Sequence, residues 1–277
     1  MLTAYYINLD DASERRTFLE ENLKKHVSSN FKYIRVPAVN ASYVANNKIA
    51  GSIRDGEKAC FVSHIKAIEL SLNEPGYALI LEDDALLGCE TTNIISNILS
   101  NMSSDIDLLF TDLCVSNLHS MISLFDLRRE SIRNREFKLV STKEISFAGS
   151  TAYILNETSK RKLLNMLKAV QSLDRPYDLV LKIWIKNGLV SSSFIFPFVT
   201  TLSEYASTTQ LQTESDRMKN MVWNAFRRLM FMEPDRSGLK YLSEIESLPA
   251  EFYDRDATDF SAILKVIFSE KFPTSSD

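Results

Sequence analysis

The sequence predicts an α/β fold, in which a largely parallel sheet is covered by helices and followed by a C-terminal helical extension. Segments of strand and helix character alternate over most of the 277-residue chain, and alternation with short connections is typical of parallel sheets. Beyond residue 212 the pattern is helical apart from a loop near Pro234. We therefore expect an α/β domain over residues 1–212 and a helical extension, residues 213–277, that packs on it.

The alternation begins at the N-terminus. The segment AYYINL predicts a strand, and a helix is expected to begin at Asp11 and to run through ERRTFLEENLKKHV. Asp11 and Glu14 have the spacing of a capping box, while Leu19 and Leu23 fall on one face of this helix. The segment FKYIRVPAV predicts the second strand.

A polar connection, NASYVANNKIAGSIRDG, leads to a helix that we expect to begin near Glu57. Apolar residues repeat along it at helical spacing, namely Phe61, Ile65, Ile68 and Leu72. The strand YALIL follows, and residues near 94–99 have helical character.

Two further strands complete the alternating part of the chain. The segment DIDLLFTD predicts a strand that ends in an acid, and FAGSTAYIL predicts a strand that leads into a helix near Asn156. In the extension, helices are predicted for TESDRMKNMVWNAFRRLMFM, GLKYLSEIESL and DFSAILKVIF.

Composition excludes several classes of function. The chain has seven glycines and contains neither Gly-x-Gly-x-x-Gly nor a Walker-type Gly-Lys-Ser/Thr, so a dinucleotide-binding or P-loop enzyme would lack its phosphate cradle. A net charge of -4 provides no basic field for nucleic acid. Three widely spaced cysteines, Cys60, Cys89 and Cys114, argue against a disulfide framework or a zinc site and fit a reducing cytoplasm. The N-terminus lacks signal-peptide character, and no apolar run is long enough to span a bilayer.

Three consecutive acids, Glu82, Asp83 and Asp84, follow the predicted strand YALIL. Adjacent carboxylates repel one another, and the carboxyl ends of such strands are where α/β proteins bind ligands. Mn²⁺ or Mg²⁺ held by Glu82 and Asp84 would neutralise them, since both side chains share a face if the strand continues. Asp83 would then point away or bind through water. The alternative is a solvated acidic loop.

The end of the first strand is expected at the same edge of the sheet. There Asn8 would hydrogen-bond a base or ribose, and Arg15 or Arg16 would face a phosphate. The alternative for the two arginines is a solvated helix face.

Four segments in order resemble glycosyltransferase family 25, the group of bacterial lipooligosaccharide and lipopolysaccharide sugar transferases related to animal collagen galactosyltransferases. They are YINLDDASERR, GEKACFVSHIKAI, ALILEDDALL, and FAGSTAYILNETSKRKLL followed by RPYDLVL. The resemblance covers residues 4 to about 210. From the arginine-rich segment that the family has after its first strand, only Arg15 and Arg16 carry over.

The resemblance implies a Rossmann-like A-type glycosyltransferase fold. It also implies transfer of a sugar with inversion from a UDP-sugar, with UDP-galactose expected, to a saccharide or lipid-linked saccharide. The ion would be Mn²⁺ or Mg²⁺, held by Glu82 and Asp84. The implied donor-binding residues are Asn8, Leu9, Arg15, Arg16, Ser63, His64 and Asp83.

An inverting displacement needs a general base, and a carboxylate is the usual choice. Asp112 ends the strand DIDLLFTD, whereas Asp178 stands at the start of the helix YDLVLKIWIKNG, where the helix dipole would weaken it as a base. Asp178 nevertheless lies in a segment that resembles the family. We retain both as catalytic candidates.

Other interpretations of individual residues stay open. His64 also suits a partly buried histidine satisfied by neighbouring oxygens, and Cys60 suits core packing. The Met and aromatic residues of MKNMVWNAFRRLMFM suggest core. The basic residues that accompany them would suit an anionic surface, which predicts peripheral contact with the cytoplasmic face of the inner membrane; they are Arg217, Lys219, Arg227 and Arg228.

Two rival functions are weighed against sugar transfer. A phosphatase of the haloacid dehalogenase type needs Asp-x-Asp-x-Thr/Val after the first strand, and NLDDAS does not supply it. A non-catalytic saccharide-binding or scaffolding protein on a transferase fold is the stronger alternative, because fold does not fix function.

Overall fold

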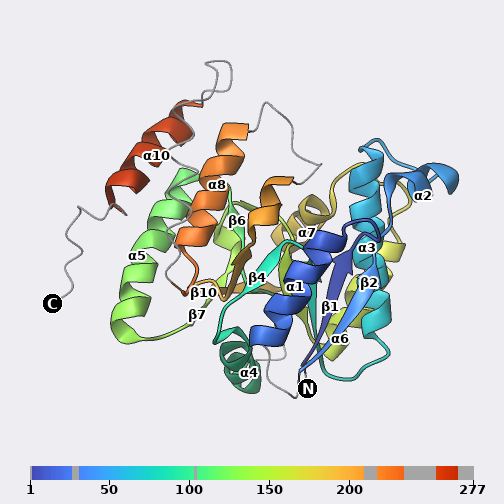
Figure 1. Ribbon diagram of the computed structural model, residues 1–277, viewed down its shortest axis with the longest axis horizontal. Coiled ribbons are helices and arrows are strands. Elements are labelled where there is room, and N and C mark those ends of the chain that lie inside the picture. The colour runs from blue at the N-terminus through green and yellow to red at the C-terminus, as the bar shows by residue number, and fades with distance from the viewer. Residues whose placement is uncertain (1, 27–30, 103–104, 209–216, 234–253, 268–277) are drawn as a thin grey trace.

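A computed structural model of the chain describes residues 2–26, 31–102, 105–208, 217–233 and 254–267. Its centre is a seven-stranded sheet with strand order β2-β1-β3-β9-β5-β10-β7 (Figure 1). The strands of this sheet are β1 Leu2–Asn8, β2 Lys32–Pro37, β3 Tyr77–Glu82, β5 Leu108–Phe110, β7 Lys138–Ser141, β9 Ala152–Leu155 and β10 Ser192–Phe196.

Five strands of the sheet, β2, β1, β3, β5 and β10, run in one direction, while β9 and β7 run in the other. The predicted α/β class with a mostly parallel sheet is therefore confirmed. The position of β9 differs from a simple parallel alternation, because this strand is inserted antiparallel between β3 and β5. As a result β9 begins at the edge of the sheet where β3 and β5 end.

Two small antiparallel sheets extend this edge. One pairs β4 Ala85–Leu87 with β11 Thr200–Leu202, and the other pairs β6 Cys114–Val115 with β8 Phe147–Ala148. β4 follows directly from the acidic residues after β3, so the chain turns there.

The helices are α1 Ser13–His26, α2 Ala41–Asn46, α3 Asp55–Ser71, α4 Thr91–Asn101, α5 Leu118–Asn134, α6 Glu157–Lys168, α7 Tyr177–Lys186, α8 Arg217–Leu229 and α10 Arg255–Ile267, with 3-10 turns η1 Thr142–Glu144 and η2 Glu204–Thr208. In Figure 1, α5, α8 and α10 lie together at one end of the molecule, and α2 and α3 lie toward the other. None of the helices in the described ranges is both long enough and apolar enough to cross a bilayer.

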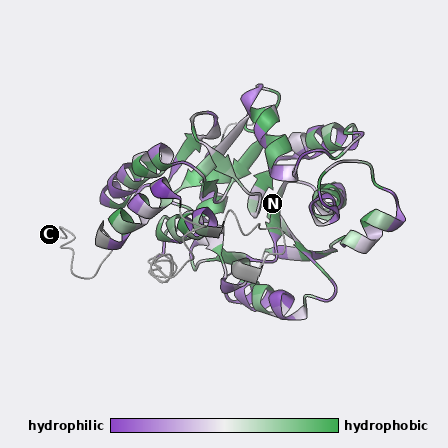
Figure 2. Cartoon of the chain, turned by 90° about the horizontal axis from the view of Figure 1, so that it is seen from above, coloured by the Kyte–Doolittle hydropathy of each residue, from purple (hydrophilic) through white to green (hydrophobic). Residues whose placement is uncertain are grey.

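Both faces of the sheet are buried, which explains the continuous apolar runs of its central strands. In β3, Ala78 and Ile80 join a core with α3, α6, α7 and α8, whereas Leu79 and Leu81 join a core with α1 and α4. Figure 2 accordingly shows hydrophobic residues gathered on the strands at the centre, with hydrophilic residues on the outer sides of the helices.

The helix boundaries differ modestly from the sequence expectations. α1 begins at Ser13 rather than at Asp11, and Leu19 and Leu23, which we expected on one face of the helix, are both buried. α3 begins at Asp55, before the expected Glu57, which instead accepts a hydrogen bond from the backbone N–H of Arg54. The predicted helix GLKYLSEIESL lies outside the described residues.

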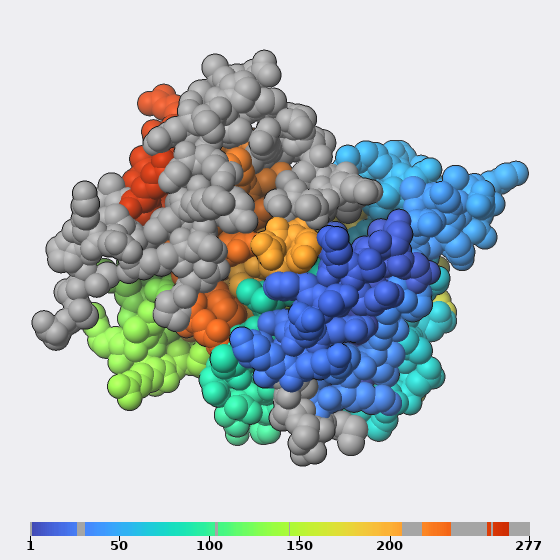
Figure 3. Space-filling model, in the orientation of Figure 1, coloured from blue at the N-terminus to red at the C-terminus, as the bar shows by residue number. Residues whose placement is uncertain are grey.

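The C-terminal segment is joined to the main core. Met218, Val222 and Phe226 of α8 are buried in the same cluster as β5, β9 and β10, and Phe260 of α10 packs beside Phe226. The core role predicted for the Met and aromatic residues of this segment is confirmed for Met218, Phe226, Met230 and Phe231, whereas Met221 and Trp223 are only partly buried. Near the N-terminus, Phe18 of α1 contacts Tyr205, and the space-filling view shows the blue N-terminal and yellow-orange segments meeting on one face (Figure 3).

Candidate active site

Side chains from several strand ends converge at one edge of the sheet. β1 ends at Asn8, β3 ends at Glu82, and Asp112 follows β5. The carboxyl ends of parallel strands meet at a common edge, which is where open α/β sheets bind ligands. Because β9 is antiparallel, the residues that precede it, Gly149 and Ser150, reach this edge as well.

The acidic turn after β3 is largely buried. Asp83 is 8% exposed and Asp84 is 6% exposed, whereas Glu82 is partly open. The alternative of a solvated acidic loop is therefore wrong for the two aspartates. The assumption that strand geometry continues through Asp84 is also wrong, because the chain turns at residues 83–84 before entering β4.

Asp83 is held by the first strand and the first helix. Its Oδ2 accepts a hydrogen bond from Asn8 Nδ2 at 2.8 Å, and its Oδ1 lies 2.7 Å from an Arg15 guanidinium nitrogen. Burial raises the pKa of Asp83, while Arg15 and Asn8 oppose the rise. Asp83 thus faces inward to the site rather than away from it, and it fixes Arg15 beside Asp84, 3.7 Å away.

Arg35 of β2, which sequence reasoning missed, orients Asn8. Its Nε donates to Asn8 Oδ1 at 3.2 Å, and a terminal nitrogen donates to the backbone oxygen of Asn8 and pairs with Asp10. An amide whose oxygen is engaged must turn its NH₂ group elsewhere, here toward Asp83. A charged residue in the middle of the strand KYIRVP was the available signal.

Asp84 carries an oxygen with no partner. Within the described residues, its buried Oδ1 accepts no hydrogen bond. Burial, followed by repulsion from Glu82, raises the pKa of Asp84 to about 7. An unpaired, buried carboxylate oxygen beside another acid suits a hard divalent cation, which would favour the ionised form. The residues present therefore fit Mn²⁺ or Mg²⁺ at Asp84.

Glu82 contacts the helix behind the sheet. Its Oε1 accepts from Ser150 Oγ at 3.1 Å and lies 3.5 Å from His64 Nε2. Burial would raise the pKa of Glu82, but His64 and Ser150 lower it below its usual value. Oε2 makes no hydrogen bond in the described part of the chain and remains available as a ligand.

His64 is fully buried on α3 and is tightly oriented. Its Nδ1 lies 3.0 Å from Tyr153 Oη, and its ring stacks on Tyr177 at a centroid distance of 4.1 Å. The histidine therefore contacts the site through Glu82. The neighbouring Ser63 hydroxyl is engaged elsewhere, since it accepts from the Val39 backbone N–H and donates to the Ala59 oxygen.

Cys60, His64 and Glu82 form a second candidate for metal binding. Their ligand atoms lie within 4.8 Å of one another, which holds for no other trio of such residues among those described. A thiol with an imidazole suits softer ions than Mn²⁺ or Mg²⁺. Burial and the charge of Glu82 raise the pKa of Cys60 well above its usual value, which disfavours the thiolate form that binds metals.

Asp112 lies in a buried ion pair that the sequence did not predict. Arg227 of α8 approaches its Oδ2 through Nε at 2.8 Å and through a terminal nitrogen at 2.5 Å. Burial raises the pKa of Asp112, and Arg227 opposes the rise. The charge of Arg227 also helps to lower the pKa of Glu82 and opposes the rise in the pKa of Asp84, so Arg227 interacts electrostatically with all three acids.

Arg228 links α8 to the acidic turn. It donates to the Ser203 backbone oxygen at 2.6 Å, and the Ser203 N–H donates to the backbone oxygen of Asp84 at 2.7 Å. Arg227 and Arg228 are both buried, so neither is available to the membrane surface that we expected them to face. Lys219 remains partly exposed, and the side chain of Arg217 lies outside the described residues.

Asp178 is half-buried in the first turn of α7. Its Oδ2 accepts from the Gly149 backbone N–H at 2.8 Å, which ties α7 to the segment before β9. Oδ1 makes no hydrogen bond within the described ranges, and Asp178 is close enough to Cys60 to raise the pKa of that thiol. The structure thus places Asp178 at the acidic edge with one free oxygen.

Two predicted donor-site residues, Leu9 and Arg16, make no side-chain hydrogen bond or ion pair within the described residues. Leu9 is half-buried, and its backbone oxygen accepts from the Ala12 N–H at the turn into α1. Arg16 is half-buried, and its side chain forms no ion pair or hydrogen bond in the described part of the chain. Donor-binding roles for Leu9, Arg16 and Ser63 stay predictions.

Comparison with known proteins identifies a family. A family model described as "Glycosyltransferase family 25 (LPS biosynthesis protein)" matches residues 1–181. This segment contains all the carboxylates of the site, but neither α8 nor α10. Among curated proteins, none matches the chain.

Solved structures resemble the chain only distantly. Mouse xyloside xylosyltransferase 1 in its apo form gives a TM-score of 0.33 at 10% identity and covers 69% of this chain, which spans 64% of that protein. Galactosyltransferase LgtC in complex with donor and acceptor sugar analogues gives a TM-score of 0.37 at 12% identity over 93% of this chain and 99% of that one. An active-site mutant of LgtC gives 0.39 at 13% identity over 90% and 98%. Similarities at this distance carry no inference about activity.

Proposed function

The chain belongs to glycosyltransferase family 25, a family described as lipopolysaccharide biosynthesis proteins, and from this premise we propose a more specific activity. The protein is a metal-dependent, inverting transferase of the A type that moves a sugar, galactose by our expectation, from a UDP-sugar to a saccharide acceptor. The observation that supports this best is the buried acidic turn, in which Asp84 keeps an unpaired oxygen between Arg15 and Arg227.

The donor diphosphate would bind where positive charge and a cation site meet. Arg15 is held beside Asp84 by Asp83, and Arg227 approaches from α8. Asn8, fixed by Arg35, stands at the end of β1 to orient the nucleoside. Glu82 and Asp84 would hold Mn²⁺ or Mg²⁺, which when bound supplies a Lewis acid for the charge on the leaving diphosphate.

We assign the general base to Asp178 rather than to Asp112. Asp112 is 2% exposed, with its Oδ2 held by Arg227 and its unpaired Oδ1 buried, whereas Asp178 is half-buried and its Oδ1 makes no hydrogen bond within the described residues. In the proposed reaction the acceptor hydroxyl gives its proton to Asp178 as its oxygen forms the new bond to the anomeric carbon. The bond from that carbon to the diphosphate breaks on the opposite face, and UDP leaves.

The C-terminal extension takes part in this activity. We propose that residues 1–212 form the transferase domain and that the extension from residue 213 completes its site, because Arg227 compensates the charge of Asp112. A cytoplasmic location follows from a UDP-sugar donor and stays part of the proposal, as does peripheral contact with the inner membrane.

The deciding experiment measures UDP release and transfer together. UDP-galactose, UDP-glucose and UDP-N-acetylglucosamine are each supplied with Mn²⁺, with and without deacylated lipooligosaccharide, and products are read by mass spectrometry. We expect acceptor-dependent UDP release, loss of release in EDTA, and a β-linked product by NMR. UDP binding without turnover of any donor would instead support a non-catalytic saccharide-binding protein, and an α-linked product would overturn inversion.

A further inference from the structure

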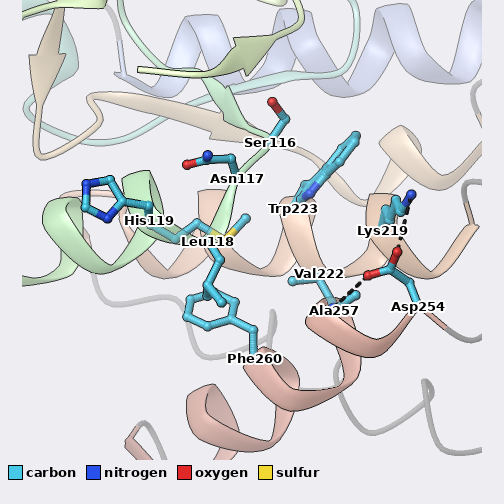
Figure 4. Close-up of a pocket in the computed structure, with 11 residues that line it drawn as sticks. Ser116, Asn117, Leu118, His119, Lys219, Val222, Trp223, Asp254, Ala257 and Phe260 are labelled. Carbon is cyan, nitrogen blue, oxygen red and sulfur yellow. Dashed lines mark hydrogen bonds and ion pairs between the residues drawn. The ribbon is translucent and has the colours of Figure 1, made fainter. Parts of the chain in front are cut away.

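A cavity lies on the side of the molecule formed by α5, α8 and α10. It is a cavity of about 340 Å³ between β6, the start of α5, α8 and α10 (Figure 4). This volume lies within the range of ligand-binding pockets. Its lining includes Ser116, Asn117, His119, Lys219, Trp223 and Phe260.

The lining joins the indole of Trp223 to several hydrogen-bonding groups. In Figure 4 the Trp223 ring rises from α8, with Ser116 and Asn117 nearby and Phe260 on the opposite side of the cavity. Asn117 Oδ1 caps α5 by accepting from the Ser120 N–H, and its amide NH₂ makes no bond within the described residues. Saccharides present apolar C–H faces beside hydroxyl groups, so a half-buried indole next to polar side chains matches their chemistry.

The cavity is connected to the candidate active site through α8. Trp223 and Arg227 are four residues apart and so share a face of the helix, separated by about 6 Å along its axis. Arg227 is the residue that pairs with Asp112. On the opposite wall, Ser116 follows Asp112 by four residues through the short strand β6.

The position of the cavity favours the acceptor over the donor. The proposed donor contacts Asn8 and Arg15 come from β1 and α1, whereas this cavity is built on α5, α8 and α10 at the other end of the molecule (Figure 1). Its walls from α8 and α10 lie outside residues 1–181, the segment that the family model covers. A part of the chain that the family model does not cover is suited to recognising an acceptor that differs from one family member to another.

We propose that this cavity is a subsite for the acceptor saccharide, in which a sugar ring stacks on Trp223 while Asn117 and His119 bind its hydroxyl groups. The proposal rests on the sugar transfer proposed above and names where the acceptor binds. The bound ring is a unit of the acceptor remote from the hydroxyl that reacts at Asp178.

The two tryptophans of the chain give a direct test. Trp184 lines a separate cavity of about 310 Å³ between the end of α6 and α7, so each tryptophan reports on a different hollow. In Trp184→Phe the only indole is Trp223, and we expect deacylated lipooligosaccharide to change its fluorescence saturably with UDP and Mn²⁺ present. In Trp223→Phe the only indole is Trp184, and we expect no change.

Kinetics supply the second readout. Trp223→Ala should raise the acceptor KM at least about tenfold, while the UDP Kd measured by calorimetry stays within about twofold. Trp223→Phe should restore part of the loss because it keeps an aromatic face. Trp184→Phe, the matched control, should leave both constants unchanged.

Failure of the subsite and failure of the transferase proposal give different results. A wild-type protein that transfers normally, together with an unchanged acceptor KM in Trp223→Ala, overturns the subsite alone. If Trp223→Ala does not fold, the exposed His119→Ala decides, since an unchanged acceptor KM there also overturns it. The fluorescence titration needs no turnover, so a saturable signal from Trp223 supports the subsite even if no donor is found, and a signal from Trp184 instead contradicts it.

Discussion

Two arginines reach the acidic edge from opposite ends of the chain, and their surroundings differ. Arg15 of α1 pairs with Asp83 and keeps 23% of its side chain exposed, whereas Arg227 of α8 pairs with Asp112 and keeps 4%. A partly exposed pair contributes little to stability and its arginine can turn to a ligand. A buried pair is costly to break, because the remaining charge has no solvent.

The difference assigns the two regions different tasks. The N-terminal region, inside the matched residues 1–181, presents the groups that we propose contact a donor, including Arg15, Asp83 and Asp84. The C-terminal region supplies a fixed positive charge that shapes the pKa of those acids from behind. In the proposed function, the acidic edge therefore depends on a helix outside the segment that identifies the family.

The largest effect should come from the acid between the two arginines. Asp84→Asn removes a charge but little volume, and we expect transfer to fall by about 10³-fold or more, since metal ions supply several kcal/mol of charge stabilisation. Melting temperature should hold, because Asp84 Oδ1 has no hydrogen bond to lose among the described residues. Asp126→Asn, at an exposed position on α5, is the control. Full activity in Asp84→Asn, or in wild type with metal excluded, would show the assignment to be wrong.

The next effect tests the base. Asp178→Asn should lower kcat by about 10²- to 10⁴-fold, the usual contribution of general-base catalysis, while calorimetry shows wild-type UDP affinity. The asparagine oxygen can still accept from the Gly149 N–H, so the link to the segment before β9 should survive. Near-normal turnover with a lowered melting temperature would make Asp178 a structural residue, and Asp112 would become the candidate base.

The buried pair is tested through stability. Arg227→Met should lower the free energy of unfolding by about 3–5 kcal/mol, because Asp112 is left as an uncompensated buried charge. Urea unfolding measures this, with the exposed Arg133→Met as control. Replacing both partners in Asp112→Leu/Arg227→Met should recover most of the loss. No recovery would mean that the pair is not the source of the effect.

The same variant has a predictable pH dependence. The pKa of Asp112 is already raised by burial, and removal of Arg227 raises it further. A carboxyl whose folded pKa exceeds its unfolded value destabilises the fold at pH values above the folded pKa, and the cost fades as pH falls through it. The deficit of Arg227→Met should therefore be smaller at about pH 5 than at about pH 8, and a deficit that grows toward low pH would contradict the argument.

The smallest effect concerns the exposed arginine. Arg15→Ala should weaken UDP binding about tenfold with Mn²⁺ present, and it should change stability by no more than about 1 kcal/mol. Arg16→Ala should weaken UDP binding less, because Arg16 has no ion pair in the described part of the chain. Calorimetry on both variants checks this. Unchanged UDP affinity in both variants would support the alternative, in which the two arginines form a solvated helix face.

The sequence predicted the elements well where apolar periodicity was strong. β1, β3 and the acids at the end of β3 follow from continuous apolar runs and from what comes after them. The antiparallel direction of β9 does not follow, because an apolar strand reads the same whichever way it pairs. The inward orientation of Asp83 does not follow from the sequence either. It depends on a turn at residues 83–84 that breaks the alternation of side chains along the strand.

The charged partners of the site were the least predictable. Arg227 stands among basic and apolar residues on α8 and looks like one side of an amphipathic helix, yet it is buried against an acid 115 positions earlier in the chain. Arg35 likewise acts through its position beside β1. Pairings of this kind are tertiary, so neither local periodicity nor motif spacing records them.

The insertion of β9 between β3 and β5 also bears on how the chain leaves the ribosome. β9 begins at Ala152, about 70 residues after β3 ends, and synthesis at about 5–20 residues per second takes about 4–14 s to cover that distance. During this time β3 has one edge open, and an apolar strand with an open edge pairs readily with other chains. Slow translation between Glu82 and Ala152 should therefore lower the soluble yield, whereas slow translation after Phe196, once β10 can pair with the remaining edge of β5, should not.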